Sequence, residues 1–353
     1  MKKQIICIGS VILLALASCT GGGKENAGGP DADSLLAAVR GIFQPLPEVA
    51  ANPDNPVTPE KVALGKHLYY DNRLSRNQTQ SCNTCHDLAT FGVDLKLTSP
   101  GDDGQNGTRN SPTTLNAALH FLQFWDGRMK DVEEQVRGPV MDPDEMNMIS
   151  EGEVMARLGK VEGYRKLFAA AFPGQPQPLT FENMSKAIGA FERILITPGK
   201  FDRFLAGDAN ALDQGELKGL KTYMESGCAA CHMGPLLGGN MFQKYPVFGT
   251  HAEWTGSTTD DKGRMEETKS EGDKYMFKVP SLRNVAETYP YFHDGSVPDL
   301  KKAVIVMAKA ELNREITSAQ VTDLVIFLKA LTGTVPEDAK VKPDALSMEN
   351  PKE

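Results

Sequence analysis

The sequence predicts an all-α protein with two domains, and three observations lead to this expectation. The chain has 353 residues, and at about 100–200 residues per domain this length allows two. Apolar residues recur at helical spacing in several segments, whereas the alternating patterns typical of strands are scarce. One short cysteine–histidine motif occurs twice, with its histidines 146 residues apart, so each domain would carry one copy.

Helices can be placed in the middle of the chain from apolar spacing and from capping residues. Phe181, Met184, Ile188, Phe191, Ile194 and Leu195 recur at helical spacing. Asp213 can cap a following helix that runs to about Ser226, because Glu216 stands three residues after it.

The C-terminal third predicts two more helices. Ser296 can cap a helix over 297–312, with Pro298 in its first turn. A last helix runs from about Ser318 to Leu331 and stops at Gly333. The loops over 96–113 and 233–280 are unusually long, and such loops often carry function or surround a bulky group.

The N-terminus has the pattern of an export signal. Lys2 and Lys3 precede an apolar run over 5–17, which is too short to span a bilayer and has the form of a signal peptide. The run ends in Leu16-Ala17-Ser18-Cys19, which resembles a bacterial lipoprotein box. This implies cleavage after residue 18 and a lipid on Cys19; the alternative is a plain secretory signal with an incidental cysteine. Because Thr20 is not aspartate, the outer membrane is favoured.

Charge and composition limit the classes of partner. The formal net charge is −8, which argues against nucleic acid, because such a partner needs a basic face. An acidic surface suits a cationic partner. A Gly-rich polar stretch follows Cys19, and we expect a flexible tether over 19–45.

The repeated motif predicts the cofactor. Its copies are Cys82-Asn83-Thr84-Cys85-His86 and Cys228-Ala229-Ala230-Cys231-His232. Cys-x-x-Cys-His is the signature of c-type haem attachment, in which two thioethers hold the haem and the histidine ligates its iron. Disulfides, zinc or a redox motif are alternatives, but a redox motif leaves the histidine after each pair unexplained. The sequence therefore predicts two covalently attached haem c groups.

The sixth iron ligand decides what each haem does. Two protein ligands are typical of an electron carrier, whereas an open position permits catalysis. The other histidines are His67, His120, His251 and His293, and there are 14 methionines, so composition alone assigns no ligand.

Further segments resemble the bacterial di-haem cytochrome c peroxidase family, which includes the MauG-like enzymes. The resemblance covers about residues 55–335. Besides the two haem motifs it is carried by Leu64-Gly65-Lys66, Asp71-Asn72-Arg73-Leu74-Ser75, Asn110-Ser111-Pro112-Thr113, Phe124-Trp125-Asp126-Gly127-Arg128, Glu134-Gln135, Asp144-Glu145-Met146, Lys262-Gly263-Arg264, Leu282-Arg283-Asn284-Val285 and Tyr291-Phe292-His293-Asp294-Gly295.

The resemblance implies a division of labour between two cytochrome c-like domains. The peroxidatic haem would occupy a domain over 46–198 and the electron-transfer haem a domain over 199–333, followed by a tail over 334–353. Met307 matches the distal ligand of the second iron, and a Met/His pair raises the potential of a haem. Without the resemblance, Met307 would be taken for a core methionine of an amphipathic helix.

The resemblance also implies a distal pocket above the first iron and a bridge for electrons between the two haems. Glu145 and Gln135 match the acid and amide above the peroxidatic iron, where the acid relays a proton and the amide positions peroxide. Trp125 matches the tryptophan between the two haems. Taken alone, Glu145 is a solvated acid at a helix start, and Trp125 is an aromatic residue at a domain interface.

Two further sites follow from the resemblance alone. Asn110, with the carbonyls of Thr288 and Pro290, matches an interdomain calcium site, and hard oxygen ligands suit that ion. His293 matches a histidine near the haems that contacts a propionate or the domain interface.

The loop over 99–107 departs from the family pattern. Many members block the resting peroxidatic haem with a histidine there, but no histidine lies between His86 and His120 in this chain. Asp102 stands at the ligand position. We therefore expect this haem to be five-coordinate or water-bound at rest, a change shared with the MauG-like branch. Met307 is retained, whereas MauG-like enzymes place a tyrosine on the second iron.

These observations predict a dihaem c-type peroxidase that reduces hydrogen peroxide to water. Electrons would come from a small cytochrome c or cupredoxin. A MauG-like enzyme that oxidises a partner protein and a non-catalytic electron carrier are the alternatives. The expected location is the periplasmic face of the envelope, with membrane contact only through Cys19, and the family's usual dimers imply a homodimer.

Overall fold

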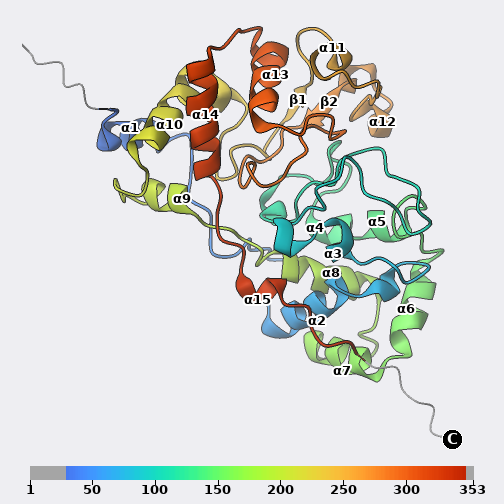
Figure 1. Ribbon diagram of the computed structural model, residues 1–353. Coiled ribbons are helices and arrows are strands. Elements are labelled where there is room, and N and C mark those ends of the chain that lie inside the picture. Colours follow the sequence, from blue (N-terminus) through green and yellow to red (C-terminus); the bar gives the residue numbers. More distant parts are fainter. Residues whose placement is uncertain (1–28, 347–353) are drawn as a thin grey trace, which may run out of the picture.

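The computed structural model describes residues 29–346, and helices dominate them (Figure 1). The helices are α1 Ala32–Val39, α2 Pro59–Tyr69, α3 Cys82–Cys85, α4 Val132–Gln135, α5 Arg137–Met141, α6 Glu151–Gly159, α7 Glu162–Ala171, α8 Phe181–Glu192, α9 Lys200–Leu205, α10 Gln214–Ser226, α11 His251–Thr255, α12 Met265–Thr268, α13 Leu300–Leu312, α14 Ser318–Ala330 and α15 Glu337–Lys340. Two short strands, β1 Phe242–Lys244 and β2 Met276–Lys278, pair antiparallel with Phe242 opposite Lys278. The predicted signal peptide and Cys19 lie outside the described residues. Within residues 29–346 none of the helices has the length and apolarity needed to cross a bilayer.

Two main apolar cores lie in different halves of the molecule. The first joins α2, α6, α7 and α8, and these helices lie together at one end of Figure 1. The second joins α1, α9, α10 and α14, at the opposite end of the figure. Much of the remaining chain is irregular, as the long loops in the sequence predict.

The two halves repeat one helix pair. In the first half α2 packs on α8, and in the second α10 packs on α14. A glycine sits at each crossing because a side chain would collide with the partner's backbone. A Cβ on Gly65 would lie 1.9 Å from the carbonyl oxygen of Ala187, and one on Gly219 would lie 2.3 Å from that of Asp323. Close backbone approach is what a glycine at such a position permits.

The repeat continues at the aromatic residues that follow each glycine. The rings of Tyr69 and Phe191 are 5.3 Å apart in an edge-to-face arrangement, and those of Tyr223 and Phe327 are 5.1 Å apart. Edge-to-face pairs at this distance add stability beyond the area they bury. The same two-helix frame is therefore built twice along the chain.

A buried polar centre joins the halves. Asn116 and Asn284 both adopt φ of 61°, and both donate from Nδ2 to the hydroxyl of Thr197, at 2.8 and 2.9 Å. In return, Asn116 Oδ1 accepts from the Thr197 amide, and Asn284 Oδ1 accepts from the Gly333 amide. All the side chains in this centre are thus hydrogen-bonded, as buried polar groups require.

Two of the predicted helix boundaries are confirmed and one is wrong. Asp213 and Glu216 form the expected capping box of α10, and α14 begins at Ser318 and is capped at Leu331. The prediction for Ser296 is wrong: α13 begins at Leu300, and Asp299 caps it by accepting from the Lys302 amide at 2.8 Å.

The reason for the Ser296 error is a long-range pairing. The Tyr291 amide donates to the Val297 carbonyl at 2.7 Å, and the two residues form an antiparallel bridge. This pairing keeps Val297 extended, so a helix cannot begin until after Pro298.

The start of the folded body differs from the expected end of the tether. Leu36, Val39 and Phe43 are buried in the second core, so the folded body begins at α1 rather than after residue 45. At the other end α15 packs on the first half, where the Tyr70 hydroxyl donates to the Ala339 carbonyl at 2.9 Å (Figure 1). Apolar side chains in both segments account for this, because burying them stabilises the fold.

Candidate active site

The first Cys-x-x-Cys-His motif forms the short helix α3 and the residue after it. Ser81 caps the helix, and its amide donates to the Thr84 hydroxyl at 2.9 Å. His86 follows the helix, and its carbonyl accepts a hydrogen bond from the Tyr69 hydroxyl at 2.6 Å. Burial lowers the pKa of His86, so its imidazole is neutral at pH 7, as iron ligation requires.

The second motif repeats this arrangement. Gly227, with φ of 90°, ends α10, and a single 3-10 turn then carries Cys228. The Tyr223 hydroxyl donates to the His232 carbonyl at 2.8 Å, as Tyr69 does to His86. Nδ1 of His232 lies 3.1 Å from the Leu237 carbonyl. A hydrogen bond there places the proton on Nδ1 and leaves Nε2 free to ligate a metal.

A large cleft lies beside the second motif. Its empty volume, including the part open to solvent, is about 1390 Å³. Cys228, Cys231 and His232 line one part of it, while Met307 of α13 and Trp125 line others; the rest of its wall is mainly apolar. A wide apolar cleft with two thiols and a neutral imidazole fits a covalently attached haem.

The four thiols are free in both motifs. Burial raises the pKa of Cys85 and of Cys228 to about 11, and it also raises the pKa of Cys82 and Cys231. Each motif thus offers two free thiols beside a buried, neutral imidazole, which is the set of groups that covalent haem attachment uses. The residues fit haem c in both halves.

Trp125 connects the halves. It follows Phe124 in a loop of the first half, but its side chain packs in the cluster that contains Met307 and Phe292. Its indole N–H donates to the Asn110 carbonyl at 2.9 Å, and its own carbonyl accepts from the Lys278 amide at 2.8 Å. The ring is thereby fixed at the wall of the second cleft.

Glu145 lies in the turn after α5, on the side of the first motif. Its charge contributes to raising the pKa of Cys82 and Cys85, which places the carboxylate near both thiols. Burial and the neighbouring charge of Asp142 raise the pKa of Glu145 to about 7, although Arg128 opposes this. The carboxyl group can therefore gain and lose a proton near neutral pH.

The sequence also draws attention to Gln135 and Asp102 in the first half. Gln135 is half-buried at the end of α4. Asp102 is 8% exposed, and both of its carboxylate oxygens accept hydrogen bonds from residues 77–79. Both carboxylate oxygens are thus already held by hydrogen bonds within the protein.

The three residues of the predicted calcium site fall in two loops. Asn110 Nδ2 donates to the carbonyls of Lys96 and Leu97, at 2.9 and 3.2 Å. Thr288 is half-buried, and Pro290 is buried and follows a cis peptide bond. The ligands that these residues offer a calcium ion are the side-chain oxygen of Asn110 and the carbonyl oxygens of Thr288 and Pro290.

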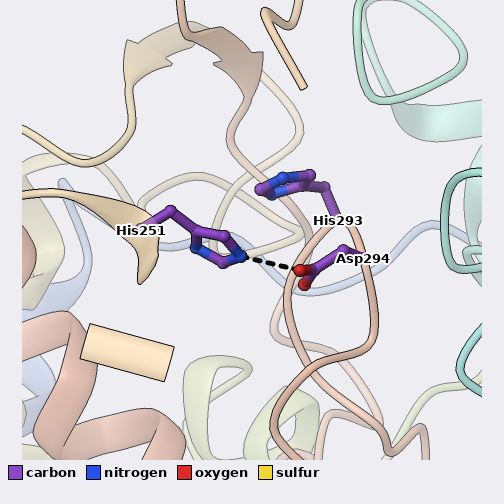
Figure 2. Close-up of side chains that lie close together, drawn as sticks. All are labelled: His251, His293 and Asp294. Atoms are coloured by element: carbon purple, nitrogen blue, oxygen red, sulfur yellow. Dashed lines mark hydrogen bonds and ion pairs between the residues drawn. The ribbon is translucent and has the colours of Figure 1, made fainter. Parts of the chain in front are cut away.

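His293 belongs to a cluster that sequence reasoning did not assemble. His251, His293 and Asp294 each offer a ligand atom within 4.8 Å of the others, and Figure 2 shows the His251 ring directed at the Asp294 carboxylate, with the His293 ring above them. His251 Nε2 lies 2.7 Å from Asp294 Oδ2. His293 is 4% exposed, lines the second cleft and stacks on Phe277 at 4.4 Å, so it fits a contact with the edge of a haem.

A signal for this cluster exists in the sequence. Phe124-Trp125-Asp126-Gly127 and Phe292-His293-Asp294-Gly295 share the pattern Phe-x-Asp-Gly. Both segments have positive φ at the phenylalanine and the glycine, and both turns are closed by an antiparallel bridge. The repeat makes His293 the counterpart of Trp125.

A buried Lys278–His120 pair was also missed. Lys278 Nζ lies 2.8 Å from His120 Nδ1 and donates to the Leu122 carbonyl. Burial lowers the pKa of Lys278 to about 7 and that of His120 well below its usual value. Neither residue lies in a local sequence motif that would have predicted this pair.

Comparison with known proteins now defines the class. Residues 59–210 match the family described as di-haem cytochrome c peroxidase. Cytochrome c551 peroxidase of Pseudomonas aeruginosa is 44% identical over 309 residues, which cover 86% of this chain and 88% of that protein. Methylamine utilization protein MauG of Methylorubrum extorquens is 33% identical over 341 residues, covering 93% and 92%.

A solved structure agrees with these relatives. The crystal structure of a MauG-like protein associated with microbial copper homeostasis has a TM-score of 0.74 and 28% identity, covering 84% of this chain and 97% of its own. The chain belongs to the di-haem cytochrome c peroxidase family. It is an oxidoreductase of the cytochrome c peroxidase kind, and the family implies two c-type haems.

Proposed function

We propose that the protein reduces hydrogen peroxide to two waters, using two electrons and two protons. The observation that carries the proposal is Glu145, a carboxyl group with a pKa of about 7 beside the thiols of the first haem motif. Haem iron, when bound, supplies the centre that takes up peroxide and delivers electrons to the O–O bond. The chain's own residues supply the protons and the positioning.

Glu145 moves the proton. In its ionised form it accepts the proton of the inner peroxide oxygen, and in its protonated form it returns that proton to the outer oxygen, which leaves as water. A pKa near the working pH suits both steps, and such relays contribute about 10²–10⁴-fold. Gln135 would hold peroxide in line through its side-chain amide.

Each half would be a cytochrome c-like domain with one haem, over 46–198 and 199–333. His86 would hold the first iron. His232 and Met307, which line one cleft, would hold the second, and a Met/His set suits electron transfer. Trp125 would bridge the halves, because it belongs to the first half by sequence and packs in the same apolar cluster as Met307.

The electron donor would be a small cytochrome c or cupredoxin. The names of the cytochrome c551 peroxidases and the net charge of −8 support a cationic carrier of this type. We also propose a lipid anchor at Cys19 facing the periplasm, calcium at Asn110, Thr288 and Pro290, and a homodimer.

The first haem would be open at rest. Asp102 stands where a distal histidine would, and its two oxygens are already bonded to residues 77–79. Turnover by fully oxidised enzyme tests this proposal. Turnover only after the second haem has been reduced would contradict it.

A MauG-like oxidation of a partner protein is the second candidate. The absence of a histidine between His86 and His120 and the similarity to MauG favour it. Modification of a protein substrate with little turnover of small donors would establish this function.

A further inference from the structure

Three segments of the first half meet at Asp102. The Asn77 amide donates to Oδ2 at 2.6 Å, and the Thr79 hydroxyl donates to Oδ1 at 2.5 Å. The Asp102 amide in turn donates to the Glu145 carbonyl at 2.7 Å. One residue thus ties the segment before the first haem motif to the turn that carries the proton-relay carboxylate.

Neighbouring contacts dock the 99–107 loop on the same turn. A Cβ on Gly101 would lie 2.2 Å from the Asp144 carbonyl oxygen, so the two backbones are in direct contact. Gln105 Nε2 donates to the Pro143 carbonyl at 2.8 Å. Asn147 Nδ2 donates to Asp103 at 2.7 Å. The loop therefore contacts the Glu145 turn at positions 101, 102, 103 and 105.

The loop also reaches the haem-attachment motif. Gln80, the residue before the Ser81 cap, donates from Nε2 to the Pro100 carbonyl at 2.8 Å. The Ser99 hydroxyl contacts the Cys85 thiol and lowers its pKa against the effect of burial. Any displacement of the loop would break contacts at both Glu145 and Cys85.

Asp102 is charged in this network. Burial opposes ionisation, but hydrogen bonds from Thr79 and Asn77 keep the pKa of Asp102 below its usual value. Hydrogen bonds to an ionised group are about twice as strong as neutral ones. Ligation of iron by this carboxylate would require breaking both of them.

We propose that Asp102 is a positioning residue that fixes the 99–107 loop against the Glu145 turn and so holds the proton-relay carboxylate in its working place. The inference rests on the proposed peroxidase function and deepens it. Asp102 stands at the position where many family members have a histidine that blocks the haem. In this chain it would instead act as a clamp that keeps the open pocket assembled. No rearrangement of the loop would then precede the first turnover.

Asp102→Ala tests the proposal in the full-length holoenzyme. The variant leaves the Asn77 amide without its acceptor and releases the loop. We expect kcat/KM for peroxide to fall about 10- to 100-fold, the size of a loss of catalytic positioning. The apparent pKa that governs the rate should fall from about 7 towards the ordinary value of glutamate, because water gains access to Glu145. Unchanged kinetics and an unchanged pH profile would overturn the proposal.

Asp102→Asn is the conservative variant. Its Oδ1 can still accept from the Asn77 amide, and the Thr79 hydroxyl can rotate to accept from the new amide. We expect it to stay within about threefold of the parent. Asp54→Asn, an exposed acid of the same half, controls for the loss of a negative charge and should match the parent. An Asn variant as impaired as the Ala variant would refute positioning by hydrogen bonds.

Hydrogen exchange separates this inference from the proposed function. The amides of residues 142 and 145–147 donate to carbonyls within or next to their own turn, as Glu145 does to Asp142. Asp102→Ala should speed their exchange while leaving haem content unchanged, even if the parent consumed no peroxide. If the Ala variant fails to take up haem, Thr79→Val, which removes one donor only, should show the same faster exchange; parent-like exchange would overturn the clamp.

Discussion

Replacing Glu145 with glutamine removes the only titration that we assign to proton transfer while keeping nearly the same side-chain volume. Burial and the charge of Asp142 raise the pKa of this carboxyl group to about 7, against an ordinary value near 4.3. The carboxylate, which accepts the first proton, therefore forms only as the pH rises through this range.

The size of the pH effect follows from that pKa. With a pKa of about 7, roughly one tenth of the enzyme carries the carboxylate at pH 6 and about one hundredth at pH 5. The parent's kcat/KM for peroxide should rise about tenfold between pH 5 and 6 and level off above about pH 8. A glutamate with an ordinary pKa would already be almost fully ionised at pH 6.

Glu145→Gln should lower kcat/KM by about 10²–10⁴-fold and abolish this rise with pH. Steady-state peroxide consumption across pH 5–9, with a saturating reduced donor, measures both effects. Glu48→Gln, an exposed acid of the first half, is the matched control and should behave as the parent does. A Gln variant that retains the parent's rate, or the parent's pH profile, would refute the assignment of Glu145 as the relay.

Three further results are expected. Trp125→Phe should slow electron transfer between the halves at least tenfold in stopped-flow experiments, without changing the spectrum of either haem; an unchanged rate would exclude the bridge. Met307→Ala should convert one low-spin haem to high spin and lower its potential in a redox titration, because a Met/His set raises the potential; a spectrum identical to the parent's would exclude it as a ligand. Gly219→Ala should destabilise the fold by about 1–3 kcal/mol in denaturant unfolding through overpacking, since its Cβ would lie 2.3 Å from a carbonyl oxygen, whereas Gly41→Ala, with nothing within 4 Å, should have little effect; equal effects would contradict the crossing.

Local sequence signals predicted the parts of the fold whose causes are local. Asp213 and Glu216 stand three residues apart and form the capping box of α10. Ser296 offers a similar signal, yet α13 begins later because Tyr291 pairs with Val297. The cap that a sequence proposes is overridden when a long-range contact keeps the next residues extended.

The same distinction holds for the site. Each haem motif is a continuous stretch of sequence, so both motifs could be predicted directly. Glu145 gains its raised pKa only from burial and from charges that the fold brings near it, and residue order alone left it a solvated acid. His251 and Asp294 are 43 residues apart and share no local pattern. The repeated Phe-x-Asp-Gly segment was the one available sign that His293 and Trp125 occupy equivalent places.

The central claim is that this protein is a peroxidase whose first haem is open at rest. The most direct measurement is peroxide consumption by fully oxidised enzyme, started by adding a reduced small cytochrome c or cupredoxin. The account predicts immediate turnover without a lag and a high-spin ferric signal before peroxide is added. A purely low-spin spectrum, or turnover only after the second haem has been reduced, would contradict the open first haem, and no turnover at all would contradict the peroxidase.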